Sequence, residues 1–487
     1  MRLALIFTVL SAIAATTFAA DTKQPNIVFI LADDLGYTDV GCFGSKYYET
    51  PNIDRLAAEG TRFTNGYVCG PNCQPSRAGL MSGQYGPRTG VYTVGGINRF
   101  DWETRPLRPI DNVTELPLDK VTLPQTLKKA GYATGMFGKW HLGADDKHFP
   151  TARGFDEAIE SAGKHFNFNT TPKTEHPADE YLADFLTDHA VDFIERHKDG
   201  PFFLYLPHYA VHAPHEAKAD LIRKFKQKPP AGGHKNAAYA AMIASVDESV
   251  GRIMETLDRL GIADNTLVIF SSDNGGVGGY DRAGLSRGGI TDNAPLKGGK
   301  GMLYEGGVRV PWIFRWKGKI AAGKTNETPI INLDLYPTFA ELAGAEKPKD
   351  YTLDGVSVAP LLLGQNDKLG RSDLFWHFPG YLGFAQDEWR TTPAGSVRSG
   401  DWKLIEFFED GRQELYNLKD DIGEEHNLAA ANPDKVKELH AKILAWRESV
   451  GAKMPTKNAK QISLEQLTKK ERQQRRRARK EAAGNDD

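Results

Sequence analysis

The sequence predicts an α/β protein: a large mixed, mostly parallel β-sheet flanked by helices, followed by a smaller C-terminal antiparallel sheet plus a helix. From Pro25 to about Leu363, short apolar runs alternate with longer amphipathic stretches, which is the pattern of repeated strand–helix units. After about Arg371, short aromatic and charged segments are separated by Gly and Asp turns, as is typical of antiparallel strands.

Four apolar runs are the strand candidates of the large sheet. Residues 26–32 (Asn-Ile-Val-Phe-Ile-Leu-Ala) are apolar on both faces, as expected of a central strand between two helical layers. Residues 266–270 repeat this character, and the runs 133–137 and 202–206 are shorter. Amphipathic stretches, two of which end at a glycine, predict the helices 51–59, 122–130, 179–197 and 239–260.

The C-terminal part divides into a subdomain and a tail. Strand candidates at 376–378, 400–405 and 414–418 precede a helical pattern over 433–447. We therefore assign residues 21–370 to the main domain, 371–455 to a C-terminal subdomain and 456–487 to a basic, disordered tail. The basic run 475–480 is interpreted as solvated, and the alternative is that it holds a polyanionic glycan or cell surface.

Composition excludes several classes of protein. The chain has 487 residues, of which 40% are hydrophobic and 25% charged, so it can bury a large core. Its 61 Lys and Arg against 63 Asp and Glu give a formal net charge of -2. A near-neutral chain has no general attraction to nucleic acid or to an anionic membrane, so we expect no nucleic-acid partner and an anionic substrate held only by a local site.

The first twenty residues have the pattern of an export signal. Arg2 is followed by the apolar run 3–13, and small residues near Ala20 suit cleavage. A membrane anchor is the alternative, but the run is shorter than the ~20 residues needed to span a bilayer. We expect export to a periplasmic or extracellular compartment, without a stable membrane anchor. A Cys42–Cys69 disulfide is one option there, and it would leave Cys73 unpaired.

Polar residues follow each of the four apolar runs. Because ligands of open α/β sheets bind beyond the carboxyl ends of the strands, these residues should meet at one edge. Three aspartates and an amide form an all-oxygen set, which suits a hard divalent cation, calcium first and magnesium second, rather than zinc. The residues are Asp33 and Asp34, then Lys139 and His141, then His208 and His212, and finally Asp273 and Asn274.

The segment beginning at Cys73 resembles the Cys-x-Pro-Ser-Arg signature of the type I sulfatases. Further matches to that family are Asp33-Asp34-Leu35-Gly36-Tyr37, Gly138-Lys139-Trp140-His141-Leu142-Gly143, Ser272-Asp273-Asn274-Gly275-Gly276, Lys300-Gly301-Met302-Leu303-Tyr304-Glu305-Gly306-Gly307 and Glu414-Leu415-Tyr416-Asn417-Leu418. These ordered matches extend over most of the mature chain. One departure is Gln84, where the family often has arginine. The resemblance implies an alkaline phosphatase-like fold and a catalytic main domain.

The resemblance also implies a mechanism. Cys73 would be oxidised to formylglycine by a maturation enzyme, and the hydrated aldehyde would attack sulfur with one hydroxyl and expel sulfate with the other. The metal ligands would be Asp33, Asp34, Asp273, Asn274 and residue 73. Arg77 would help to hold and polarise the formylglycine hydroxyls, and Lys139 would bridge nucleophile and sulfate. Lys300 and His212 would bind sulfate and protonate the leaving alcohol. His141 would accept a proton for sulfate release.

Some assignments remain open at this stage. Either Lys297 or Lys300 could reach the site, and the family motif selects Lys300. His208 is interpreted as structural, whereas His215 could face substrate. The preferred function is hydrolysis of sulfate esters on sulfated carbohydrate, with specificity set by the loops 95–109, 164–180 and 279–295. The alternatives are a phosphodiesterase or phosphonate hydrolase on the same scaffold, or a non-catalytic sulfoglycan-binding relative with unmodified Cys73.

Overall fold

The computed structural model describes residues 24–385 and 388–463, together with residues 466, 471–472, 474 and 476. The predicted export segment 1–20 and nearly all of the basic run 475–480 lie outside the described residues. None of the helices in the described part of the chain combines the length and the apolar character that crossing a bilayer requires.

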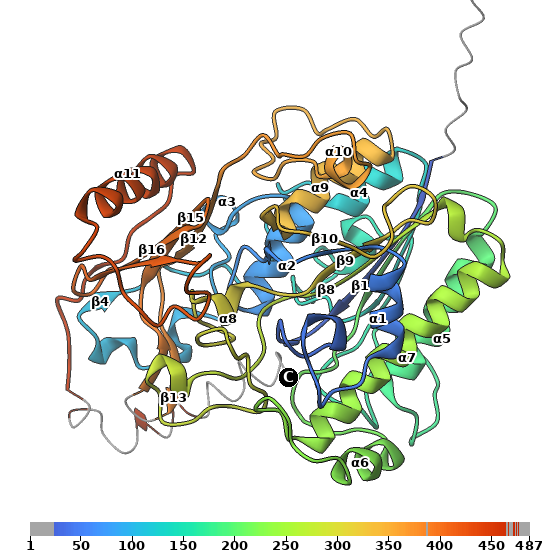
Figure 1. Ribbon diagram of the computed structural model, residues 1–487, viewed down its shortest axis with the longest axis horizontal. Coiled ribbons are helices and arrows are strands. Elements are labelled where there is room, and N and C mark those ends of the chain that lie inside the picture. Colours follow the sequence, from blue (N-terminus) through green and yellow to red (C-terminus); the bar gives the residue numbers. More distant parts are fainter. Residues whose placement is uncertain are drawn as a thin grey trace, which may run out of the picture.

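An eight-stranded sheet forms the centre of the main domain (Figure 1). Its central strand β1 pairs in parallel with β7 on one side and with β8 on the other. β9 runs against both of its neighbours, so the sheet is mixed and mostly parallel, as predicted. In spatial order the strands are β10 (Lys324–Asn326), β2 (Thr61–Phe63), β9 (Trp312–Arg315), β8 (Thr266–Ser272), β1 (Asn26–Ala32), β7 (Phe202–Pro207), β5 (Ala133–Gly138) and β6 (Glu157–Glu160).

Helices cover both faces of this sheet because successive residues of a strand point to opposite faces. Val28 and Ile30 of β1 enter one apolar core, whereas Ile27 and Phe29 enter the other. The first core is covered by α1 (Pro51–Ala58), α5 (Leu182–His197), α6 (Ala219–Lys226) and α7 (Ala237–Arg259). The second is covered by α2 (Cys73–Ser82), α4 (Leu123–Lys129), α9 (Leu335–Leu342) and α10 (Ala359–Leu362).

The C-terminal subdomain is a four-stranded antiparallel sheet beside the main domain, with one helix packed on it (Figure 1). Leu439 and Ile443 of the helix contact Val397, Leu404 and Leu415 of the sheet. The elements are β12 (Asp373–Phe378), β15 (Ala394–Ser399), β16 (Trp402–Phe407), β17 (Gln413–Asn417) and α11 (Pro433–Ser449). A separate hairpin, β13 (Leu382–Ala385) and β14 (Glu388–Thr391), joins β12 to β15.

One expectation and one open option differ from the structure. The tail was predicted to begin at residue 456, but β18 (Thr456–Lys457) pairs with β4 (Leu107–Arg108), and Ile462 donates its amide to the Glu103 carbonyl. The chain is therefore attached to the main domain beyond the predicted boundary. The Cys42–Cys69 disulfide, which the sequence left as an option, is not formed: both thiols are free, and Cys69 belongs to a core cluster that excludes Cys42.

Candidate active site

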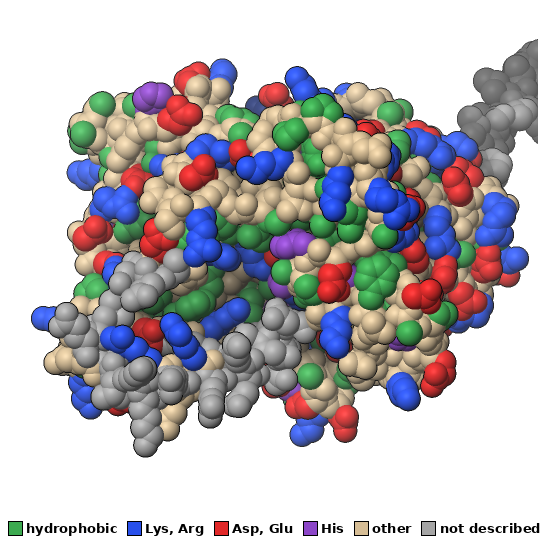
Figure 2. Space-filling model, turned by 90° about the horizontal axis from the view of Figure 1, so that it is seen from below, with side chains coloured by type: hydrophobic (Ala, Val, Ile, Leu, Met, Phe, Trp, Pro, Cys, Tyr) green, Lys and Arg blue, Asp and Glu red, His purple; other side chains and the backbone are tan. Residues whose placement is uncertain are grey.

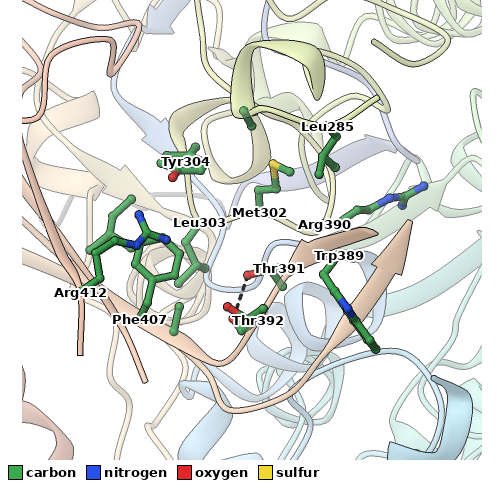
Figure 3. A pocket seen from close by; sticks show the side chains of 13 residues that line it. Leu285, Met302, Leu303, Tyr304, Trp389, Arg390, Thr391, Thr392, Phe407 and Arg412 are labelled. Carbon is green, nitrogen blue, oxygen red and sulfur yellow. Dashed lines mark hydrogen bonds between the residues drawn. The ribbon is translucent and has the colours of Figure 1, made fainter. Parts of the chain in front are cut away.

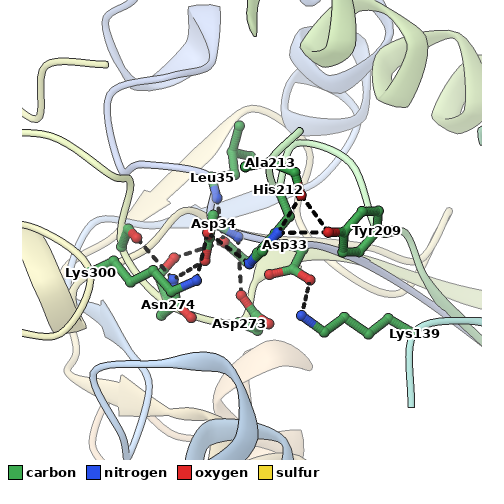
Figure 4. A network of polar contacts seen from close by, with 12 residues as sticks. Asp33, Asp34, Leu35, Lys139, Tyr209, His212, Ala213, Asp273, Asn274 and Lys300 are labelled. Carbon is green, nitrogen blue, oxygen red and sulfur yellow. Dashed lines mark hydrogen bonds and ion pairs between the residues drawn. The ribbon is translucent and has the colours of Figure 1, made fainter. Parts of the chain in front are cut away.

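The ends of four parallel strands bring the predicted polar residues together (Figure 4). Asp33 and Asp34 follow β1, and Asp273 and Asn274 follow the neighbouring β8. Lys139 follows β5, and its Nζ lies 2.9 Å from Asp33 Oδ2. All five side chains are buried, so the four charged ones lie in a low-dielectric environment, where each electrostatic contact is strong.

Helix α2 supplies Cys73 and Arg77, and this helix was missed in the sequence analysis. Cys73 is its first residue and Arg77 lies one turn later, which places both side chains on the same helical face. Arg77 donates from Nε to Asp273 Oδ2 at 2.9 Å, and its Nη2 lies 3.4 Å from Asp33 Oδ2. The N-cap position of Asn72 was the available sequence signal for a helix start.

The acidic side chains form a cluster suited to a cation. One oxygen each of Asp33 and Asp273 and the Cys73 sulfur lie within 4.8 Å of one another, as do groups of Asp33, Asp34 and His212. Asp33 Oδ1 and Asn274 Oδ1 are buried and accept no hydrogen bond from any residue that the structure describes. Buried oxygens are normally satisfied, so these two fit the role of metal ligands.

The carboxylates perturb one another strongly. Burial raises the pKa of Asp273 to about 8, and the charge of Asp33 adds to this effect against the lowering influence of Arg77. Burial also raises the pKa of Asp33, but nearby cationic groups outweigh this effect and hold the pKa below its usual range. These groups are Lys139, His212, Arg77 and Lys300. Carboxylates this close repel each other unless positive charge compensates them, which is a second reason to expect a divalent cation.

Cationic groups also surround residue 73. Burial alone would raise the pKa of the Cys73 thiol, but Lys139, His141 and Lys300 overcome it and lower the pKa to about 6. His141 is hydrogen-bonded to the thiol and has a backbone φ of 66°, a left-handed conformation that is uncommon for histidine. The environment therefore stabilises negative charge on the atom at residue 73.

The structure distinguishes the two candidate lysines. Lys300 Nζ donates to Asp34 Oδ2 at 2.7 Å, as Figure 4 shows. Lys297 Nζ instead lies 4.4 Å from the centre of the Tyr304 ring and donates to the Glu424 carbonyl at 3.1 Å. The family motif and the geometry therefore select the same residue, Lys300.

The histidines also separate into different environments. His212 Nε2 lies 3.6 Å from Asp34 Oδ2, and its Nδ1 contacts the Tyr209 hydroxyl and the Ala213 carbonyl at 2.9 and 2.8 Å. His208 is fully buried, contacts Ser249 Oγ at 2.9 Å and has a pKa lowered to about 3 by burial, which agrees with a structural role. Sequence reasoning missed Tyr209 and also His165, whose Nε2 contacts the His212 carbonyl at 2.8 Å.

An open groove borders the cluster on the side of His212. Its volume is about 980 Å³, and it is formed by the loops 163–167 and 213–217 together with Ile222 of α6. His215 lies in its wall and Phe166 offers an aromatic face. Figure 2, in which the molecule is seen from below, shows a hollowed surface with Lys, Arg and His side chains around it. Residues 164–167 fall in one of the predicted specificity loops.

Comparisons with known proteins match most of the chain to sulfatases. The sulfatase family model matches residues 25–345, and the model of the C-terminal part of N-sulphoglucosamine sulphohydrolase matches residues 299–449. A sulfatase of Formosa agariphila is 36% identical over 87% of this chain and 89% of its own. The N-acetylgalactosamine-6-sulfatase of Homo sapiens is 34% identical over 70% of this chain and 66% of its own. The solved structure of Ps i-CgsB with k-i-k-neocarrahexaose has a TM-score of 0.74 and 30% identity, and covers 94% of this chain and 98% of that chain.

Proposed function

The chain belongs to the sulfatase family and hydrolyses sulfate esters, and we propose that it acts on sulfated carbohydrate through a formylglycine made from Cys73 beside a bound calcium ion. The observation that carries this proposal is the convergence of Cys73, Lys139 and Lys300 on the acidic cluster. It joins a nucleophile position, two cationic side chains and a cation site within one buried centre.

The proposed ligands of the cation are Asp33, Asp34, Asp273, Asn274 and residue 73. Their oxygens are hard donors, which favours calcium and leaves magnesium as the second choice. When bound, the cation would polarise the hydroxyls at residue 73 and neutralise the carboxylates. Arg77 already contacts both Asp273 and Asp33, so it orients two of the proposed ligands.

Residue 73 is the proposed nucleophile. A hydrated aldehyde at this position supplies two hydroxyls, one for attack on sulfur and one whose deprotonation releases sulfate. Lys139 and Lys300 are placed to hold the sulfate oxygens, because both lie against the carboxylates that border residue 73. Their fixed positive charges would stabilise negative charge that spreads over the ester as the S–O bond breaks.

The two histidines have proposed roles as proton carriers. His141 contacts the side chain of residue 73 and would accept the proton of the remaining hydroxyl. His212, with Lys300, would supply a proton to the departing alcohol. The contact of His212 Nδ1 with the Ala213 carbonyl turns Nε2 toward Asp34 and the reaction centre, which supports this assignment.

The groove beside His212 supports a carbohydrate substrate. A space of about 980 Å³ that is open to solvent accommodates an extended chain better than a compact aryl ester. Lys164, Asn167, His215 and Glu216 supply polar groups that can bind sugar hydroxyls, and Phe166 can pack against a sugar ring. The relatives named for N-acetylgalactosamine 6-sulfate and the neighbour bound to a neocarrahexaose support the same substrate class. Export and a maturation enzyme that acts on Cys73 belong to this proposal.

The test uses protein exported by a host that makes formylglycine. Trypsin should release residues 63–77, and we expect the mass of this peptide to show an aldehyde in place of the Cys73 thiol. The same sample should hydrolyse carbohydrate sulfate esters far faster than phosphate diesters or phosphonate esters. An unmodified Cys73 in a fully active sample would refute the formylglycine proposal, and faster phosphodiester hydrolysis would favour the alternative function.

A further inference from the structure

The hairpin β13–β14 places an arginine beside the loop that carries Lys300. Gly301 donates its amide to the Pro71 carbonyl at 2.7 Å, so this loop lies against the segment that leads to Cys73. Gly301 has a φ of +90°, and a Cβ at this position would lie 3.3 Å from Arg390 Cδ. The stem of Arg390 therefore packs directly on the residue that follows Lys300.

Aromatic rings fix the guanidinium group of Arg390. Its Cζ lies 5.0 Å from the ring centre of Tyr280 and 5.5 Å from that of Phe384. Tyr280 also donates its hydroxyl to the Lys300 carbonyl at 2.9 Å. One tyrosine thus contacts both the backbone of the proposed sulfate-binding lysine and the cationic head of Arg390.

The charge of Arg390 is not compensated within the described part of the chain. Its guanidinium makes no hydrogen bond or ion pair there, and its Nε is shielded from solvent without an acceptor. Glu388, on the same strand, is already engaged by the amide and hydroxyl of Ser286 at 3.0 and 2.6 Å. A partly buried guanidinium without an acceptor is costly, so this position favours an anionic ligand.

Arg412 provides a contrast in the same region. It lines a pocket of about 180 Å³ between the hairpin and residues 302–304 (Figure 3). Arg412 is paired with Glu414, and its Cζ lies 3.8 Å from the ring centre of Phe407. Arg390 lines the same pocket, and in Figure 3 its side chain points away from Thr391 and Thr392. The charge of Arg412 is therefore compensated by Glu414, whereas the guanidinium of Arg390 is available to a ligand.

A second cation lies near Arg390. The Cζ of Arg287 lies 5.9 Å from the ring centre of Phe384, the ring that Arg390 also contacts. Arg287 is exposed and has no carboxylate partner among the residues that the structure describes. Two guanidinium groups therefore lie at one aromatic ring, beside the loop that carries Lys300.

We propose that Arg390, assisted by Arg287, binds a second anionic substituent of the glycan whose sulfate ester is cleaved at residue 73. The inference rests on the proposed carbohydrate specificity and adds a charge requirement to it. The planar guanidinium can donate two parallel hydrogen bonds to either a sulfate ester or a carboxylate, so both groups fit this chemistry. Arg390 is thus a specificity-determining residue and takes no part in breaking the S–O bond.

The experiment measures inhibition of 4-nitrophenyl sulfate hydrolysis by a panel of sugars, using the full-length, matured protein. The panel contains monosulfated disaccharides, matched disulfated disaccharides, and monosulfated disaccharides with a uronate carboxylate. The variants are Arg390→Gln, Arg390→Lys and Arg287→Gln, and Arg412→Gln is the matched control. The aryl ester has a single anionic group, so its kcat/KM should be the same in all of these proteins.

Wild type should bind at least one dianionic sugar better than its monoanionic counterpart. Arg390→Gln should lose about ten- to a hundredfold in affinity for that sugar only, as expected for a charge-assisted contact. Arg390→Lys should retain part of the preference, Arg287→Gln should lose less than Arg390→Gln, and Arg412→Gln should lose none. If the preferred sugars are disulfated, the second anionic substituent is a sulfate; if they carry a uronate, it is a carboxylate.

Two binding results would overturn the inference while leaving the proposed function intact. One is equal binding of monoanionic and dianionic sugars by wild type, and the other is a preference that survives in Arg390→Gln. A uniform loss of aryl sulfate hydrolysis in Arg390→Gln would also contradict it, because it would place Arg390 in the shared sulfate site. Failure of wild type to bind or hydrolyse any carbohydrate sulfate would instead refute the proposed carbohydrate specificity.

Discussion

The candidate active site can be compared with a second group of fully buried charged side chains, here called the interdomain cluster. This cluster consists of Glu305 of the main domain with Lys403 and Glu424 of the C-terminal subdomain. Lys403 Nζ lies 2.8 Å from Glu305 Oε1 and 2.9 Å from Glu424 Oε1. Glu305 Oε2 accepts from the Tyr67 hydroxyl at 2.7 Å, and Glu424 Oε2 accepts from the Glu305 amide at 2.7 Å.

The difference lies in what the buried oxygens contact. In the interdomain cluster every carboxylate oxygen has a protein donor or cation, so the charges join two domains and have no need of a ligand. In the active site, Asp33 Oδ1 and Asn274 Oδ1 have no such donor among the described residues. Burial of charge alone therefore does not identify a functional site. What distinguishes the active site is that unpartnered oxygens of Asp33 and Asn274 lie together with other carboxylates at the strand ends.

The largest effect is expected at residue 73, in a host whose maturation enzyme acts only on cysteine. Cys73→Ser keeps one hydroxyl that can attack sulfur but lacks a second hydroxyl to expel sulfate. The variant should release at most about one equivalent of alcohol per site and then stop. Burst kinetics and intact-protein mass measure this outcome. Cys42→Ser, the same change at a half-buried cysteine outside the site, should turn over normally.

Sustained turnover by Cys73→Ser, with residue 73 shown by mass to be serine, would contradict the aldehyde mechanism. It would also weaken the contrast between the two buried clusters, because the active-site cluster would then support hydrolysis without a formylglycine nucleophile.

Removal of the proposed cation should have the next largest effect. Chelation should abolish sulfate ester hydrolysis, and calcium should restore it better than zinc because the ligands are hard oxygens. The interdomain cluster uses only protein groups, so the far-ultraviolet circular dichroism spectrum of the stripped protein should remain that of a folded α/β chain. Full activity in a sample shown by elemental analysis to be free of metal would remove the metal assignment.

The interdomain cluster should respond to substitution in the opposite way. Lys403→Met leaves two buried carboxylates without their shared cation, and we expect the free energy of unfolding to fall by about 3–5 kcal/mol. Activity per folded molecule should change far less than in Cys73→Ser. Denaturant unfolding and active-site titration measure the two quantities. Lys317→Met, which breaks an exposed pair with Asp264, is the control and should cost less than about 1 kcal/mol.

Sequence reasoning predicted the core of the fold well because apolar runs and helical periodicity are local signals. The run 26–32 has the same bounds as β1 in the structure, and the helix predicted over 51–59 is α1 at Pro51–Ala58. Helix α2 was missed because its ten residues are all buried, so it has no polar face to produce an amphipathic pattern. The attachment of residues 456–457 was missed because pairing with β4 depends on residues more than 300 positions away.

The residues of the candidate site were predicted from strand ends and motif matches. The contacts made by loop residues around the site could not be predicted in this way. Asp33, Lys139 and Asp273 stand directly after apolar strands, so their meeting follows from the order of the sheet. Tyr209 and Arg390 carry no such signal, since their contacts depend on how loops fold over the sheet. Glu305 belongs to a matched family motif, yet its side chain serves the interdomain cluster.

The smallest effect concerns pH and Glu424. Burial and the charge of Glu305 raise the pKa of Glu424 to about 7 despite the opposing effect of Lys403, while an exposed glutamate titrates near 4.5. Between these values the folded protein holds a proton that the unfolded chain lacks, so the contribution of Glu424 to stability falls as pH rises from about 4.5 to 7. Glu424→Gln removes this titration and resembles the protonated side chain. The free energy of unfolding of the variant, measured by thermal unfolding, should therefore increase relative to that of wild type between pH 5 and pH 8, by on the order of 1–2 kcal/mol. A difference that stays constant with pH, or that favours wild type as pH rises, would show that Glu424 is ionised throughout and that Lys403 fully compensates both carboxylates.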